Sequence, residues 1–119
     1  MAKKIMTCKS APEIELQFSG GEAILLRFDI NCLASIQELE GGLKGFLEKS
    51  VSEMAAEVVY AAGKEHNDGF NMLKAKEIIA NMAPDNVMEI INTFSESVGT
   101  NADGEVTKKL IAQLLEKKN

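Results

Sequence analysis

Cysteine and histidine are the side chains best suited to metal binding or nucleophilic chemistry, and this chain has few of them. Cys8 and Cys32 lie far apart, and His66 is the single histidine. A structural zinc site takes four such ligands, usually in close pairs. A nucleophile also needs a neighbouring base and an orienting group, which no spacing here supplies. We therefore expect Cys32 in the core, Cys8 in a polar segment and His66 near the end of a helix.

Two short loops resemble binding motifs but lack the residues that do the binding. In the stretch NADGEVT over 101–107, aligning Gly104 with the glycine of a calcium loop puts Gly99 at the first ligand position and Leu110 at the twelfth. Neither supplies a carboxylate, so we expect no calcium site there. The stretch GGLKG over 41–45 lacks the ending of a phosphate-binding loop and is interpreted as a helix break. The sequence predicts no enzyme and no cofactor.

Composition narrows the class of protein further. The 119 residues carry 13 basic and 18 acidic side chains, a net charge of −5, with 45% apolar residues. Such a length favours a single domain. The acidic balance argues against nucleic-acid binding, and no apolar run is long enough to cross a membrane. The N-terminus has no apolar signal segment, so we expect a cytoplasmic protein with reduced thiols.

The N-terminal third predicts an arm and a β-hairpin. We expect residues 1–12 to be a flexible basic arm and residues 13–119 to be a single domain. Apolar residues alternate with polar ones from residue 13, which is the period of a half-buried strand. A Gly20-Gly21 turn follows, then a second strand, so we expect a hairpin over 13–29. Ile24 and Leu26 are expected on its buried face, and Leu25 on the other.

The remainder shows helical periodicity. Apolar residues recur every three or four positions, with helix starts expected at Asp29 or Asn31, at Ser50 and at Asp103. A short apolar segment at 43–47 is expected to make one or two helical turns. The sequence thus predicts a mainly α, α+β fold, with the hairpin packed on a bundle of about five helices. The main helices are expected at about 31–40, 51–63, 72–82, 85–98 and 105–117.

Methionine and charge each allow two interpretations. Met54, Met72, Met82 and Met88 are either ordinary core residues or part of a groove for varied apolar helices. The acidic body with basic ends is either a solvated surface or a device that helps chains or partners find each other. The long stripes at 85–98 and 105–115 predict a homo-oligomer. We expect a partner-binding surface formed by Leu25, Val87, Ile91, Phe94, Val98, Leu110 and Leu114.

Several segments resemble the tail assembly chaperones of long-tailed bacteriophages and prophages. The stretch LRFDINCL over 26–33, followed by Ile36 and ELEG over 38–41, is similar to a segment that follows a short hairpin in that family. An alanine-rich helix ending in YAAGKEH, an Ile-Ile helix over 77–80 and an amphipathic helix over 87–98 continue the likeness. It covers roughly residues 13–99.

The resemblance implies a non-catalytic helper made in the host cell. It would keep the largely helical tape measure protein in solution and help tail tube subunits polymerise around it. The alternative is a small acidic interaction module, either an adaptor or a structural subunit, of unrelated role.

Overall fold

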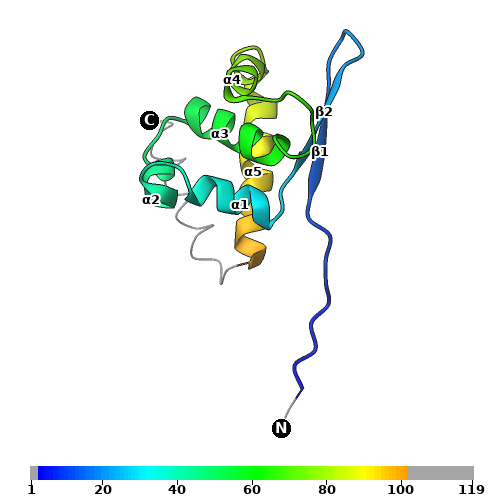
Figure 1. The fold of residues 1–119 in the computed structure, drawn as a ribbon, viewed down its shortest axis with the longest axis vertical. Coiled ribbons are helices and arrows are strands. Elements are labelled where there is room, and N and C mark those ends of the chain that lie inside the picture. Colours follow the sequence, from blue (N-terminus) through cyan, green and yellow to red (C-terminus); the bar gives the residue numbers. More distant parts are fainter. Residues whose placement is uncertain (1–2, 102–119) are drawn as a thin grey trace.

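The computed structural model describes residues 3–101 as a β-hairpin followed by helices (Figure 1). The predicted mainly α, α+β fold is confirmed. In chain order the elements are β1 (Glu13–Gln17), β2 (Ala23–Arg27), α1 (Ile30–Gln37), α2 (Gly42–Leu47), α3 (Val51–Gly63), α4 (Met72–Ala80) and α5 (Pro84–Asn101). The helix expected at 105–117, with its cap Asp103 and with Leu110 and Leu114, lies outside the described residues.

The hairpin has the predicted faces. Its strands are antiparallel, with Ile14 opposite Leu26, Leu16 opposite Ile24, and Glu15 opposite Leu25. Directly opposite residues share a face, so four apolar side chains point one way and Leu25 points the other. The turn closes through Phe18 N–H, which donates to the Glu22 carbonyl at 2.9 Å. Gly21 takes a φ of 88° in this turn, a value that side-chain-bearing residues rarely adopt.

Polar side chains begin three of the helices. Asp29 Oδ1 accepts from Cys32 N–H at 3.0 Å, and Ser50 Oγ accepts from Glu53 N–H at 3.3 Å. Asn71 Oδ1 accepts from Lys74 N–H at 2.9 Å. Each satisfies a backbone amide that has no partner within its own helix. Asp29 and Ser50 confirm the predicted starts, whereas Asn71 was not anticipated.

Helix ends differ from the predicted ones by a few residues. The first helix stops at Gln37 rather than at residue 40, because a tight turn precedes Gly41, whose φ is 82°. The short apolar segment is α2, and it begins at Gly42. Helix α4 ends at Ala80 rather than at residue 82, and α5 begins directly at Pro84, where proline's missing amide costs no hydrogen bond.

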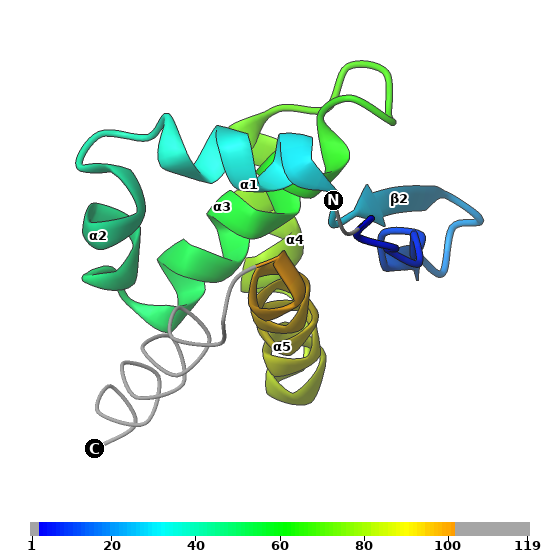
Figure 2. The same cartoon turned by 90° about the horizontal axis from the view of Figure 1, so that it is seen from below.

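Helix α3 occupies the middle of the core. It packs against α1, α4, α5 and β2 (Figure 2). Its buried side chains are mostly small, which allows four neighbours to approach one short helix. These buried residues are Met54, Ala55, Ala56, Val58, Val59, Ala61, Ala62 and Gly63. Cys32 and Ile36 of α1 join them, as predicted for Cys32.

The segment ahead of β1 stands away from this core. Residues 3–12 have no helix or strand, and they continue from β1 away from the hairpin tip (Figure 1). The Pro12 carbonyl accepts from Phe28 N–H at 2.9 Å, so the pairing of the two strands extends one residue beyond β1. We call residues 3–11 the arm.

Candidate partner-binding groove

The hairpin is attached to the helices mainly through β2. This strand packs on α3, and Leu26 is fully buried there. Ile14, Leu16 and Ile24 share the face of Leu26 but are only partly buried. An apolar strand face that is left half-covered is a surface on which further apolar groups gain free energy by burial.

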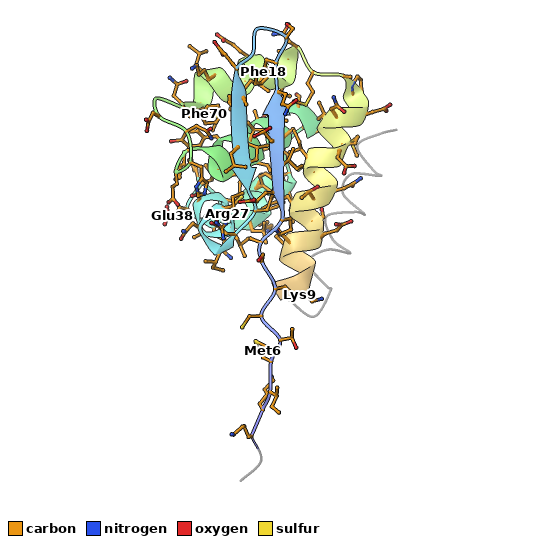
Figure 3. The ribbon with its side chains drawn as sticks, turned by 90° about the vertical axis from the view of Figure 1, so that its right-hand side faces the viewer. Met6, Lys9, Phe18, Arg27, Glu38 and Phe70 are labelled. Atoms are coloured by element: carbon orange, nitrogen blue, oxygen red, sulfur yellow. The ribbon has the colours of Figure 1, made fainter. Side chains whose placement is uncertain are left out.

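A groove lies between this face and the junction of α4 and α5. Its volume is about 660 Å³. We call it the hairpin groove. Its apolar lining comes from the hairpin on one side and from the helices on the other: Ile14, Leu16, Phe18, Ile24, Ile78, Met82, Ala83 and Ile90. Phe18 stands at the hairpin tip with 36% of its surface exposed (Figure 3).

The rim of the hairpin groove is acidic. Among the described residues that line it, Glu22, Glu77 and Glu89 are acidic and Lys74 is the single cation, whereas the Glu15 side chain points to the outer hairpin face, as that of Leu25 does. Asn81, Asn86 and Gln17 add neutral hydrogen-bonding groups. An apolar floor with an acidic rim favours an apolar partner segment that carries basic residues at its edges.

One asparagine holds the hairpin on the helices. Asn67, in the loop after α3, accepts from Leu25 N–H at 3.1 Å and donates to the Leu25 carbonyl at 2.8 Å. Its amide also donates to the Gly63 carbonyl at 2.8 Å, at the end of α3. The backbone of Leu25 is thereby tied to the helical body. This loop side chain fixes one wall of the groove.

Charged groups reinforce the base of the hairpin. Arg27 lies 4.0 Å from Glu13 across the strands and 3.7 Å from Asp29. His66 Nε2 lies 4.0 Å from the same Asp29 carboxylate. These pairs are partly exposed, so each contributes little to stability, but together they orient the start of α1 beside the hairpin.

A second hollow, of about 720 Å³, lies between α3 and α4. Met72, Ile79 and Ala56 line it together with Ser52, Glu53, Glu57, Lys76 and Ala80. Glu57 is paired with Lys49, which leaves this hollow with a more balanced charge than the hairpin groove. Of the two, the hairpin groove has the longer apolar lining and the unbalanced rim.

The predicted partner-binding residues do not gather on one surface. Val87, Ile91, Phe94 and Val98 are buried in the core, so the α5 stripe faces α3 and is not an open binding face. The prediction of an open face is wrong because a helix that is buried by its own domain has the same periodicity as a helix that is buried by a partner. Leu25 lies on the outer hairpin face, next to Asn67. Leu110 and Leu114 lie outside the described residues.

Ile78 and Met82 belong to the apolar repeat that predicts the helix at 72–82, and both are partly buried where they line the groove. The methionine pattern is divided: Met54 is fully buried, Met82 lines the hairpin groove and Met72 lines the second hollow. The sequence signal that could have indicated the groove was the hairpin itself, because a two-stranded hairpin needs further packing against its apolar face to be stable.

Of the two cysteine side chains, one is packed in the core and the other is exposed. Cys32 is buried, and burial together with the nearby Asp29 carboxylate raises the pKa of its thiol to about 12. Cys8 is free and exposed on the arm. Within residues 3–101, no three His, Cys, Asp or Glu side chains are placed to share a metal ion. In the same range, no helix has the length and apolar character needed to cross a membrane.

Comparison of the chain with protein-family models, with curated proteins and with solved structures found no match.

Proposed function

We propose that this chain is a non-catalytic phage tail assembly chaperone, which binds an apolar segment of the tape measure protein in the host cytoplasm and assists polymerisation of the tail tube. The observation that carries the proposal is the hairpin groove. Its apolar floor is half-covered in the isolated chain, and its rim is acidic. The resemblance described above supplies the identity of the partner.

The chemistry of the groove suits this task. A tape measure protein is long and largely helical, and before the tube encloses it, its apolar stripes are prone to aggregate. A groove lined by Ile, Leu, Phe and Met side chains accepts such a stripe without demanding one sequence, because these contacts are non-directional. The carboxylates of Glu22, Glu77 and Glu89 at the rim then contact basic residues that flank the stripe. The chain's net charge of −5 keeps the complex in solution.

The proposal is tested by co-expression with the tape measure protein encoded beside this chain's gene. We expect the soluble fraction of the tape measure protein to rise several-fold when the chain is present. A double variant, Phe18→Asp with Ile78→Asp, should abolish that rise, because it places two charges on the apolar floor. Leu73→Asp is the matched control, since Leu73 is 67% exposed on the same helix as Ile78 but outside the groove.

Circular dichroism of the variants separates loss of binding from loss of folding. Equal solubilisation by the parent chain and the folded double variant would refute the groove as the binding site. The function itself would be refuted if the chain left tape measure solubility unchanged and its gene lay apart from tail genes. That combination would favour the small acidic interaction module.

A further inference from the structure

The arm is basic and carries exposed apolar side chains, whereas the rim of the hairpin groove is acidic. It carries Lys3, Lys4 and Lys9 together with two large apolar side chains, Ile5 at 85% and Met6 at 71% exposure. Figure 3 places Met6 and Lys9 on the extended arm, with Met6 well below the helices. The groove rim has the opposite sign of charge, with three carboxylates against one lysine. The arm therefore complements the apolar floor of the groove through Met6, and its lysines complement the acidic residues of β1 and of the rim.

Strand β1 also offers an edge for pairing. Phe28 N–H donates to the Pro12 carbonyl, and Phe18 N–H donates to the Glu22 carbonyl. The backbone N–H and C=O groups of the even-numbered residues of β1 therefore point toward β2. Backbone groups alternate in direction along a strand, so those of Glu13, Glu15 and Gln17 face the other edge. An exposed edge of this kind accepts a further strand. Because Pro12 faces β2, its missing amide does not interrupt that edge.

The arm of the same chain is poorly placed to use this edge. It leaves β1 in line with the strand, so it would have to reverse direction within residues 10–12, where Pro12 is fixed by its bond to Phe28. An arm from another copy needs no reversal. Two identical extended segments also pair antiparallel around a two-fold axis, which closes the assembly at two copies.

We propose that two copies of this chain pair reciprocally through residues 4–18, antiparallel and centred on Ala11, so that each arm adds a third strand to the other copy's hairpin and covers its groove. The alternation of the strand sets the register. Met6 and Cys8 lie on the groove face, opposite Leu16 and Ile14 of the other copy. Lys9 lies on the outer face, opposite Glu13. The pairing is a property of the chain alone, and because the arm covers the groove, a tape measure segment binds there only after it displaces the arm.

The first test traps the register with a disulfide. In the proposed pairing, Cys8 is opposite Ile14 at a position without hydrogen bonds between the two residues, where the Cα atoms are about 4.5 Å apart. That separation suits a disulfide. The full chain carrying Ile14→Cys, oxidised with oxidised glutathione, should form a covalent dimer, with the two thiols' protons and electrons passing to glutathione. Buried Cys32 stays out of the reaction.

Two controls define the outcome of the trapping. The double variant Ile14→Cys with Cys8→Ser should give no covalent dimer. Leu16→Cys should give at least tenfold less than Ile14→Cys, because it requires a register shifted by two residues. A greater yield from Leu16→Cys would overturn the pairing, as would a disulfide formed within one chain.

The second test removes the pairing without touching the folded body. Thr7→Pro deletes an arm amide that faces the partner strand, whereas Ser10→Pro deletes one that faces away from it. Sedimentation equilibrium should give a dimer for the parent and for Ser10→Pro, and at least a tenfold weaker dimer for Thr7→Pro. A parent that is monomeric at 200 μM, or equal dissociation constants for all three proteins, would overturn the inference.

Discussion

The two sides of α3 differ in how completely they bury similar apolar patterns. On the helical side, Phe46 and Phe94 are each about 1% exposed and meet edge to face, with ring centroids 5.7 Å apart. On the hairpin side, Ile14, Leu16 and Ile24 alternate as regularly but are only partly buried. Periodicity in the sequence therefore identifies the apolar face of an element. Whether that face is buried depends on the elements that pack against it. Here β2 reaches α3, and β1 is left beside a groove.

The largest difference in stability is expected between alanine substitutions of one phenylalanine from each side. Phe94→Ala should lower the free energy of unfolding by about 3–5 kcal/mol, because it leaves a cavity in the core. Phe18→Ala should lower it by less than about 1 kcal/mol, because Phe18 is already partly exposed. Urea denaturation followed by circular dichroism measures both. Equal losses would show that the hairpin side is as closely packed as the helical side.

The join between the two sides is tested at Asn67. Asn67→Ala removes three hydrogen bonds to backbone groups of Leu25 and Gly63, and should cost about 2–3 kcal/mol. Amide exchange in β2 should accelerate more than exchange in α5. Asn81→Ala is the control, since that exposed side chain makes one bond, to Glu77, and should cost under about 1 kcal/mol. Uniform acceleration throughout the chain would contradict the role of Asn67 as a local clamp.

Close approach at the end of α3 is tested with one methyl group. A Cβ at Gly63 would lie 3.1 Å from the Phe70 ring and 3.3 Å from Leu26, so Gly63→Ala should cost about 1–2 kcal/mol. Gly20→Ala, in the hairpin turn, adds a methyl with no atom within 4 Å and should change stability by less than about 0.5 kcal/mol. Thermal unfolding distinguishes the two. A neutral Gly63→Ala would mean that Phe70 moves aside freely.

A further effect appears only at alkaline pH. The folded state raises the pKa of the Cys32 thiol from 9.0 to about 12, so the unfolded chain loses this proton first as the pH rises. Stability from this group is therefore complete below pH 9 and declines toward pH 12. Cys32→Ala should reduce the fall in stability between pH 8 and 10.5. A Cys32→Ala slope equal to the parent's would contradict the burial of the thiol.

The elements were more predictable from sequence than the site. Alternation over 13–18, the Ser50 cap and the stripe of α3 are local signals, and local geometry determined the outcome. The groove depends on where β1 stands relative to the α4–α5 junction, which no spacing encodes. Val87 and Phe94 illustrate the limit: an apolar stripe has the same sequence pattern whether its own domain or a partner covers it.

The position of α3 in the sequence also determines when the hairpin can be buried during synthesis on the ribosome. The hairpin leaves the ribosome first, yet β2 finds its cover only when Val51–Gly63 has followed. At ordinary translation rates, Leu26 and its neighbours spend several seconds exposed in the nascent chain. Glu13 and Glu15 alternate with the apolar residues of β1, and charges in such positions disfavour association between neighbouring nascent chains.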